Sequence, residues 1–529
     1  MKMKLSISKP FAFLLGSAII LTACTKDFEK INTNPASYSQ SNFDPNYLLT
    51  MAQLTYTGST DFSYETWRGN LIYASTMMQG LSSVVGYWAG DKYLLNEGYT
   101  AAYWQVAYPE QVKPIVDLVQ FTKDKPERKN LYQISRLMKA MILERITDLY
   151  GDIPYFGAGQ GYYTNNFFPV YDKQELIYDD LLKEVEEAVN ALDEAGDKPG
   201  GDVFYNGDIP SWKKFGNTLL LRIAMRLTKV NPDKAKSYVT KVQGKTMQSN
   251  EDNAKVGHDA VGGRATINRN SQVLIGDGGQ ENYYVKWSDT FINFLKGAND
   301  PRLGKVSVTQ LYMNENSKDQ NGKGNANPAV QKGMPNGKDL SGIPGRTIGG
   351  DASYTSFPDY SSPSPYMIKK DGPTFILTYA ESELLLADAA QRWSIGGSAA
   401  THYTNGVKAS LTYLKQYDAA MEISESAAQN FVDANPYNAA NGLKMINDQY
   451  WANAITMLDF YETWSNWRRT GFPVLNPVIY PNNATNGTIP RRFPYPSSEA
   501  SSNPVNYKTA HDGVAGGDLL TSRVWWDKQ

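Results

Sequence analysis

A single cysteine occurs in the 529 residues of this chain, so no disulfide bond within the chain can stabilise its fold. The core must come from packed apolar side chains, and their share of 41% of the composition is sufficient for a large core. The sequence is rich in flat aromatic side chains, with 35 Tyr and 11 Trp, but contains only 3 His. This composition favours binding surfaces over proton-transfer chemistry.

The first residues have the organisation of an export signal. A basic start (Lys2 and Lys4) precedes an apolar segment that is too short to span a bilayer. The segment ends in Leu21-Thr22-Ala23-Cys24, which resembles a bacterial lipobox, in which the cysteine is acylated and becomes the first residue of the mature chain. We expect a lipoprotein signal peptide at residues 1–23 and a lipid anchor with a polar tether at residues 24–45. The alternative is an ordinary signal peptide with a chance cysteine.

Charge and hydropathy exclude some classes of partner. The net charge is −2, whereas a protein that binds nucleic acid needs a basic face for the phosphates. No later apolar run reaches the length of a membrane span, so the lipid is the only membrane attachment that the sequence indicates. Residues 46–529 contain no clear linker, and we expect them to form a single domain.

Helical periodicity predicts a mainly α fold built from antiparallel helix pairs. The clearest helix covers residues 129–150 and ends at Gly151, which permits a positive φ. Asp172 and Ser211 are candidate caps for two further helices. Other helices are expected at residues 45–58, 63–80, 100–123, 374–392, 402–416, 423–435 and 442–464. Strand alternation is confined to short pieces such as residues 305–312, and the Gly- and Asn-rich residues 314–350 are expected to be a long surface excursion.

Seven short stretches, in order along the chain, together resemble one family. They are TDLYGDIPY (147–155), WKKFGNTLLLRIAMR (212–226), NDPRL (299–303), TYAESELLLADA (378–389), ETWSNWRRTGFP (462–473), PRRFPYP (490–496) and VWWD (524–527). Their order and spacing, behind a lipobox, resemble the SusD/RagB family of nutrient-binding outer-membrane lipoproteins of Bacteroidetes. The resemblance covers essentially the whole chain after the signal peptide.

The resemblance implies a SusD-like fold, in which degenerate tetratricopeptide-type helix pairs form a scaffold and large irregular loop regions carry the ligand site. It implies a lipid-anchored protein on the cell surface, in the outer membrane, that acts as a lid over a SusC-like TonB-dependent β-barrel transporter. Such a lid captures nutrient oligomers, with oligosaccharides favoured here, and it is not an enzyme. The same lid role in an oligopeptide importer is the alternative, and a surface glycan hydrolase is the third reading.

Sugars are bound by flat aromatic faces and planar polar side chains, so we expect ligand contacts at aromatic residues in loops. Three loop groups are candidates. The first is Tyr87, Trp88, Asp91, Tyr93 and Asn96; the second is Tyr283, Tyr284 and Trp287, preceded by Gln280 and Asn282; the third is Tyr354, Phe357, Asp359, Tyr360 and Tyr366. The alternative for each ring is that it fills the core beneath a loop.

Other motifs favour the scaffold over chemistry. Arg222, Arg226 and Glu381 lie on apolar helix faces, where unpaired charges are costly, so we expect them to form ion pairs. Arg468 and Arg469 are expected to stack on aromatic rings or to pair with acids. The histidines His258, His402 and His511 lie far apart and lack a metal-ligand spacing. No catalytic residue, cofactor or metal is therefore predicted, and the presence of a structural calcium stays open.

Overall fold

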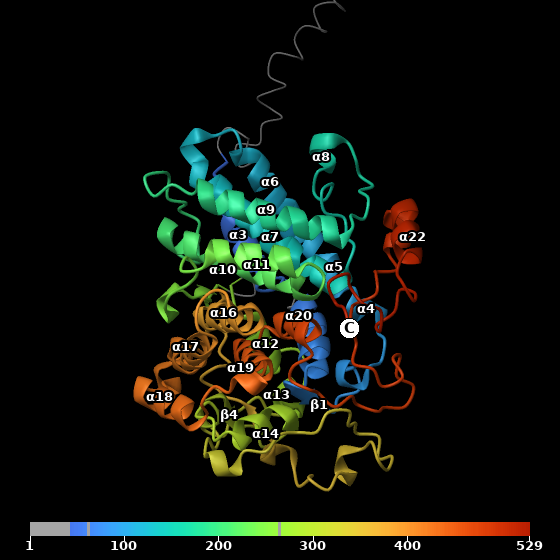
Figure 1. Cartoon of the computed structure of the whole chain (residues 1–529). Coiled ribbons are helices and arrows are strands. Elements are labelled where there is room, and N and C mark those ends of the chain that lie inside the picture. Colours follow the sequence, from blue (N-terminus) through green and yellow to red (C-terminus); the bar gives the residue numbers. More distant parts are fainter. Residues whose placement is uncertain (1–42, 61–63, 263–265) are drawn as a thin grey trace, which may run out of the picture. The chain divides into compact units, whose positions relative to one another are not determined.

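The described part of the chain consists mainly of helices that pack in pairs. The structure is a computed structural model that describes residues 43–60, 64–262 and 266–529 (Figure 1). Cys24 lies outside the described residues, and so do the predicted signal peptide and lipid anchor. Residues Asn46–Gln529 form one contact-rich unit. No helix among the described residues combines the length and the apolar content that crossing a bilayer requires.

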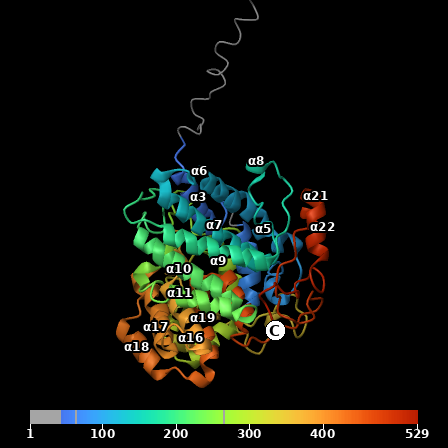
Figure 2. The ribbon, with the colours of Figure 1, turned by 45° about the horizontal axis from the view of Figure 1, so that its top comes forward.

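The N-terminal half of this unit is a row of helices. Figure 2 shows α6, α7, α9, α10 and α11 one after another, and each packs against the next. The bounds in this half are α3 Asn46–Tyr56, η1 Thr66–Ser75 (a π-helix), η2 Gly90–Lys92 (a 3-10 helix), α4 Glu97–Thr100, α5 Ala102–Ala107, η3 Tyr108–Val112 (a π-helix), α6 Lys113–Thr122, α7 Lys129–Tyr150, α8 Gly161–Thr164, α9 Gln174–Ala191, α10 Ile209–Arg226 and α11 Pro232–Val242.

The C-terminal half continues the pairing. Helix α16 packs against α17 and α19, α19 packs against α20, and α16 also meets α10, which joins the two halves. The bounds here are α12 Arg269–Leu274, α13 Glu281–Tyr284, α14 Asp289–Gly297, α15 Leu303–Val306, α16 Tyr379–Trp393, α17 Ala399–Thr412, α18 Glu425–Ala434, α19 Gly442–Met457, α20 Phe460–Thr470, α21 Glu499–Ser502 and α22 Pro504–Asp512. The mainly α fold expected from the sequence is confirmed.

Strands are few and short among the described residues, and they join segments that lie far apart in the sequence. All three ladders have two antiparallel strands. They are β1 Leu81–Ser83 with β3 Val285–Trp287, β2 Ala254–Val256 with β6 Thr374–Leu377, and β4 Ser307–Val308 with β5 Ser362–Pro363. Of the predicted strand at residues 305–312, only Ser307–Val308 is a ladder strand.

Local chemistry explains where the helices begin and end. Helix α7 has the predicted bounds, and Gly151 follows it with a φ of 87°. Helix α10 is capped by Asp208, whose carboxylate accepts a hydrogen bond from the backbone N–H of Ser211 at 3.0 Å, so the predicted cap at Ser211 is wrong. The predicted cap at Asp172 is also wrong, because its carboxylate instead accepts from the backbone N–H groups of Tyr155 and Phe156.

Two helices expected from the sequence are shorter in the structure. Residues Thr374–Leu377 form β6, so α16 begins only at Tyr379, where the Thr378 side chain caps it. The helix expected over residues 442–464 is two helices. Leu458 adopts a left-handed conformation with a φ of 61°, and Asp459 caps α20 by accepting from the backbone N–H of Glu462 at 3.2 Å. A local capping interaction thus overrides continuous hydrophobic periodicity.

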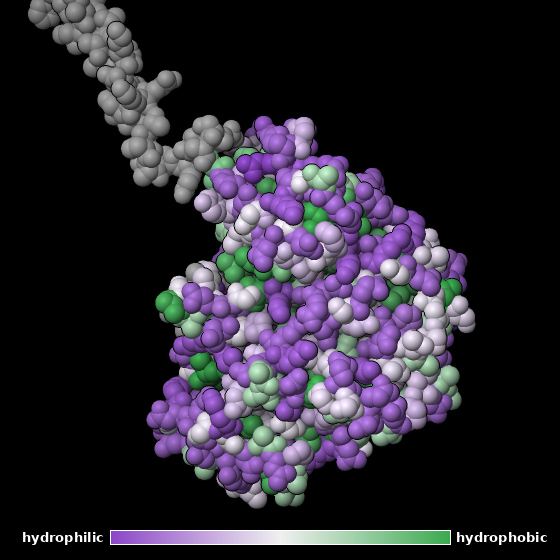
Figure 3. All heavy atoms as spheres, turned by 90° about the vertical axis from the view of Figure 1, so that its left-hand side faces the viewer, coloured by the Kyte–Doolittle hydropathy of each residue, from purple (hydrophilic) through white to green (hydrophobic). Residues whose placement is uncertain are grey.

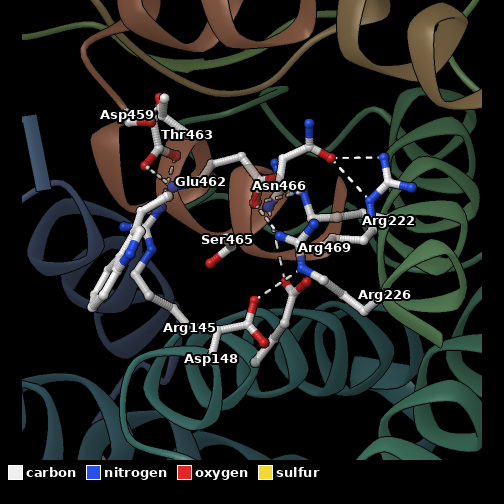
Figure 4. A network of polar contacts seen from close by, with 12 residues as sticks. Arg145, Asp148, Arg222, Arg226, Asp459, Glu462, Thr463, Ser465, Asn466 and Arg469 are labelled. Carbon is white, nitrogen blue, oxygen red and sulfur yellow. Dashed lines mark hydrogen bonds and ion pairs between the residues drawn. The ribbon is translucent and has the colours of Figure 1, made fainter. Parts of the chain in front are cut away.

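A network of charged side chains occupies the centre of the scaffold, where α7, α10, α16 and α20 meet (Figure 4). Arg222 is buried and donates two hydrogen bonds to the Glu381 carboxylate, at 2.6 and 2.9 Å. Arg226 is buried between Asp148, at 3.1 Å, and Glu462. The ion pairs predicted for these arginines are confirmed. Each charge has an opposite charge on another helix, which is the condition for burying it.

The C-terminal residues complete this network. Arg468 lies between the rings of Trp464 and Trp526, with its guanidinium carbon 4.3 and 4.8 Å from their centroids. Arg469 pairs with Asp388 at 3.1 Å. The two predicted alternatives both occur: Arg468 stacks on aromatic rings, and Arg469 pairs with an acid. Burial alone would raise the pKa of Asp388, but the charges of Arg469 and Arg392 lower it to about 2.

The outer surface differs from one side of the unit to the other. The face in Figure 3, on the side where α17 and α18 lie in Figure 1, is mainly polar, with hydrophobic residues scattered singly. Such scattered residues are usual on a protein surface. Exposed aromatic side chains are concentrated elsewhere, in the loop that carries α8.

Candidate functional site

The loop after β1 and the segment before β3 come together because these two strands pair. Leu81 lies opposite Trp287 in the ladder, and Ser83 lies opposite Val285. The pairing places Tyr87 beside Glu281, the first residue of α13, and the tyrosine hydroxyl donates a hydrogen bond to that carboxylate. Burial, followed by this carboxylate, raises the pKa of Tyr87. The first two predicted loop groups are therefore neighbours.

Tyr87 belongs to a cluster of half-exposed aromatic side chains around one cation. The guanidinium carbon of Arg68 lies 4.1, 4.9 and 5.3 Å from the ring centroids of Tyr64, Trp67 and Tyr99. The Trp67 ring meets the Tyr87 ring edge-on, with the centroids 6.1 Å apart. We refer to these five residues as the aromatic platform. Its members come from η1, the residues just before it, α4 and the loop after β1.

The remaining residues of the first predicted group build the loop. The rings of Trp88 and Tyr93 and the carboxylate of Asp91 are buried, with 0 to 1% of each residue exposed. Asp91 pairs with Lys92 at 2.9 Å. Tyr93 has a φ of 52° and accepts through its hydroxyl from the backbone N–H of Val478 at 3.1 Å. In this conformation these side chains offer no face to a ligand.

Asn96 is exposed, and its role in the structure is local. Its side-chain oxygen accepts a hydrogen bond from the backbone N–H of Tyr99 at 3.2 Å and so caps α4. The cap fixes the start of the helix that carries the Tyr99 ring into the aromatic platform. Tyr87 and Asn96 are therefore the two residues of this predicted group that combine exposure with a position beside the platform.

The second and third predicted groups form one aromatic cluster. Phe357 lies at its centre, with ring centroids 4.8 to 5.5 Å from those of Tyr283, Tyr284 and Tyr354. Tyr360 is fully buried beside Tyr354, whereas Tyr283 and Tyr354 are half-buried. Val84 and Val85, from the end of β1, also pack here. The structure thus brings members of all three predicted groups to one region, although Tyr87 and Tyr360 are 273 positions apart in sequence; Tyr366 instead packs against the main core.

Trp287 is the exception within the second group. Its ring is fully buried, its indole N–H donates to the backbone oxygen of Val306 at 2.9 Å, and it packs against Phe291 with the centroids 5.0 Å apart. It therefore fills the core beneath the loop, as the alternative interpretation states. The flanking residues are tied to the excursion at residues 314–350, since Asn282 donates to the backbone oxygen of Ser317 and Tyr284 donates to Glu315.

A lysine lies under this cluster without an acidic partner among the described residues. Lys286 in β3 is buried and donates to the Ser362 hydroxyl at 2.8 Å. Its ammonium nitrogen is 5.9 Å from the centroid of the Tyr283 ring. Burial lowers its pKa to about 7. Within the described part of the chain, no three His, Cys, Asp or Glu residues are grouped to hold a metal ion.

Sequence reasoning missed most of the platform. Tyr64, Trp67 and Arg68 were expected inside a helix at residues 63–80, and Tyr99 was expected next to the helix at residues 100–123. The sequence did contain a local signal: Tyr64, Trp67 and Arg68 stand at positions i, i+3 and i+4. This spacing places two aromatic rings and a cation on one helix face. That spacing on a segment expected to be a core helix does not by itself indicate exposure.

Comparison with known proteins identifies the family. A family model described as "Starch-binding associating with outer membrane" matches residues 39–496. The chain belongs to this SusD-like family. Members of the family are binding proteins associated with the outer membrane. No match was found among curated protein sequences.

Solved structures of SusD-like proteins support the assignment. A chitin-binding protein is 31% identical, with a TM-score of 0.79 over 92% of this chain and 100% of its own. A SusD-like protein from Bacteroidetes AC2a is 24% identical, with the same TM-score and coverage. A chitin-binding SusD homologue from Flavobacterium johnsoniae is 22% identical, with a TM-score of 0.71 over 92% of this chain and 98% of its own. The last two likenesses concern the fold alone.

Proposed function

We propose that this SusD-like protein captures oligosaccharides at the cell surface through its aromatic platform. The observation that carries the proposal is the convergence of three aromatic rings on Arg68, with the Tyr87 ring packed edge-on against one of them, at a surface that the scaffold does not cover. Flat rings pack against the C–H faces of sugar rings, while the guanidinium and the side chain of Asn96 supply hydrogen bonds to hydroxyl groups.

Chitin-type oligosaccharides are the first ligands to test. The proposal of this class draws on the 31% identical relative, which is described as chitin-binding, and on the several rings of the platform, against which sugar rings can pack. The family description names starch, so maltooligosaccharides form the second panel. Mixed oligopeptides form the third, because aromatic surfaces also bind peptides. The role excludes turnover, so a bound oligosaccharide should be recovered intact.

We further propose that the protein is held at the outer membrane by a lipid on Cys24 and delivers its ligand to a SusC-like TonB-dependent barrel. The support is the lipobox-like sequence that ends at Cys24 and the family assignment. In the parent strain, Cys24→Ser should move the protein from the membrane fraction to the soluble fraction. Affinity purification of the native protein from detergent-solubilised membranes should recover a TonB-dependent barrel. Purification without any such barrel would contradict the delivery step.

Isothermal titration calorimetry of the full chain in detergent micelles tests the ligand and the site together. We expect binding of one oligosaccharide class and an affinity loss of about three- to tenfold in Tyr87→Ala, the size expected for one aromatic contact. Tyr47→Ala is the matched control, since Tyr47 on α3 is 61% exposed but lies outside the platform. Equal effects of the two substitutions would refute the platform.

The three panels separate the possible functions. Binding of oligopeptides alone would overturn the oligosaccharide proposal and favour the role in an oligopeptide importer. Cleavage of an oligosaccharide during the titration, followed by chromatography of the products, would indicate a hydrolase. Absence of binding to any panel would overturn ligand capture by the platform of the isolated protein.

A further inference from the structure

The loop between α7 and α9 contains an unusual number of exposed apolar side chains. Its stem is closed by the backbone pair Ile153 and Asp172, and α8 lies at its tip (Figure 1). Six of its residues are large, hydrophobic and exposed: Phe156, Tyr162, Tyr163, Phe167, Phe168 and Val170. This differs from the polar face in Figure 3 with its scattered apolar residues. We call residues 154–171 the α8 loop.

Contacts on both sides hold the α8 loop in place. At its tip the Tyr163 hydroxyl donates to the Asp117 carboxylate of α6 at 2.9 Å. On the other side, Asn503 and Asn506 donate to the backbone oxygens of Pro169 and Phe168, at 2.7 and 2.9 Å. Side chains of two separate segments thus fix the backbone on which the exposed rings stand. A surface built in this way is preorganised for a ligand.

A cavity of about 190 Å³ lies where the α8 loop meets α5, η3 and α21. The cavity is lined by the aromatic rings of Trp104, Tyr108 and Phe167 and by the polar residues Glu499 and Asn503, among others. Phe167 is 68% exposed, so it stands at the entrance, whereas Trp104 is 4% exposed and belongs to the floor.

Ring stacking and a hydrogen bond hold the floor of the cavity, and two of its polar residues, Glu499 and Ser502, have oxygens that can accept hydrogen bonds. The Trp104 ring stacks on the Tyr171 ring, with the centroids 5.6 Å apart and the planes 25° apart. The Tyr171 hydroxyl donates to one carboxylate oxygen of Glu499 at 2.8 Å. The second oxygen of Glu499 receives no hydrogen bond from the described residues, so it is available to a donor. The Ser502 hydroxyl donates to the backbone oxygen of Ser498 at 3.1 Å, which leaves its own oxygen as an acceptor.

This combination fits the chemistry of a sugar ring. One face of a pyranose is apolar and packs on aromatic rings, while its hydroxyl groups donate hydrogen bonds to acceptors such as the free oxygens of Glu499 and Ser502. We propose that the cavity under the α8 loop is a second carbohydrate subsite that holds one pyranose ring of an oligosaccharide. The ligand class rests on the proposed function, but the residues are separate from the aromatic platform.

Two neighbouring phenylalanines provide a matched pair of variants. Phe167 lines the cavity, whereas Phe168 is 59% exposed on the same loop and does not line it. Saturation-transfer difference NMR and calorimetry on the full chain, with tri-N-acetylchitotriose and maltotriose as probes, should show a three- to tenfold loss of affinity for Phe167→Ala at the second site. Phe168→Ala should bind as the parent does. Equal losses in the two variants would overturn the subsite.

A variant without the platform separates the two sites. In Trp67→Ala/Tyr87→Ala, the proposed subsite should still bind the probe, and adding Phe167→Ala should weaken that binding by about three- to tenfold. If the double variant loses all binding while the parent binds, the subsite is wrong and the platform stands. If the double variant binds as the parent does and Phe167→Ala removes binding, the platform is wrong and the subsite stands. Absence of binding to the parent would overturn both.

A substitution at Glu499 tests the ligand class against a cationic peptide side chain. Glu499→Gln removes the charge and replaces one carboxylate oxygen by an amide NH2 group, while the amide oxygen can still accept from the Tyr171 hydroxyl. A neutral sugar should lose about two- to tenfold in affinity, the size expected for one lost hydrogen bond at an open site. Binding of tetralysine by the parent, lost in Glu499→Gln, together with no binding of either sugar probe, would overturn the carbohydrate assignment.

Discussion

The centre of the helical scaffold and the aromatic platform both hold arginines, but in opposite ways. Arg222 is 2% exposed, and its charge is matched by a carboxylate on another helix at 2.6 Å. Arg68 is half-exposed and has aromatic rings around it, at 4.1 to 5.3 Å from its guanidinium carbon. A cation that pairs with buried carboxylates uses its hydrogen-bond donors within the fold. A cation surrounded by ring faces at the surface keeps donors for a ligand.

The largest expected effect comes from breaking the scaffold network. Arg222→Met leaves the Glu381 carboxylate buried without its partner, so the free energy of unfolding should fall by about 3–5 kcal/mol. Denaturant unfolding followed by circular dichroism measures this loss. Lys113→Met is the control, because the pair of Lys113 with Asp117 is largely solvated and its loss should cost less than about 0.5 kcal/mol. Similar midpoints for the two variants would contradict this account of the network.

Trp88→Ala should be almost as destabilising, although Trp88 lies next to Tyr87 in sequence. The Trp88 ring is fully buried, so its removal leaves a cavity and should cost about 3–5 kcal/mol. Tyr87→Ala removes a ring that is 38% exposed and should cost no more than about 1 kcal/mol. Thermal unfolding of the two variants separates a core residue from a surface residue. A stable Trp88→Ala protein that had lost ligand binding would mean that this ring does contact the ligand.

Two buried lysines sharpen the comparison between paired and unpaired charges. Lys92 pairs with Asp91 at 2.9 Å, whereas Lys286 has the Ser362 hydroxyl as its hydrogen-bond partner. Lys286→Met should therefore stabilise the protein at neutral pH by about 1–4 kcal/mol, while Lys92→Met should destabilise it by about 3–5 kcal/mol. Denaturant unfolding at pH 7 measures both changes. Destabilisation of the same size in both variants would show that pairing with an acidic side chain does not determine the stability effect of a buried lysine.

The pH dependence of Lys286 has a definite sign. Its pKa is about 7 in the folded protein because of burial, against an ordinary value of 10.5. Between these values the unfolded chain binds the proton and the folded protein does not, so the contribution of Lys286 to stability rises as pH increases from 7 to 10.5. The stabilising effect of Lys286→Met should therefore shrink across this window. An effect that stays constant from pH 7 to 10.5 would contradict the lowered pKa.

The smallest expected effect is at the platform itself. Tyr87→Phe keeps the ring but removes the hydroxyl that donates to Glu281. Affinity for the oligosaccharide should change by no more than about 0.5 kcal/mol, because the stacking face remains and the hydroxyl is bonded to Glu281. Calorimetry of this variant beside Tyr87→Ala separates the ring from the hydroxyl. A larger loss in Tyr87→Phe than in Tyr87→Ala would show that the ring is not the binding element.

The scaffold was predictable from sequence because local chemistry determines much of it. The bounds of α7, the stop at Gly151 and the presence of ion pairs at Arg222 and Glu381 follow from periodicity, glycine conformation and the cost of a buried charge, whereas the choice of partner comes from the structure. The break between α19 and α20 was not predictable, because the apolar pattern continues through Leu458 and only the capping by Asp459 interrupts the helix.

The site was predictable only in part, because it depends on contacts between distant segments. Aromatic composition in loops pointed to Tyr87, Tyr283 and Tyr354, and the structure leaves these three rings partly accessible. Composition did not separate these three residues from the buried Trp88 and Trp287. Exposure depends on which strand pairs with β1 and on which side chains residues 314–350 cover. Ligand binding by any of these residues stays a prediction.

Trp526 donates its indole N–H to the Asp148 carboxylate at 2.9 Å, across 378 positions of sequence. Arg226 pairs with the same carboxylate, so one of the central ion pairs also depends on a residue that lies 378 positions later in the chain than Asp148. The central ion pairs of the scaffold therefore cannot all form while only the N-terminal helices have been synthesised. We expect the centre of the scaffold to remain incompletely packed, and accessible to chaperones and proteases, until Trp526 has been synthesised.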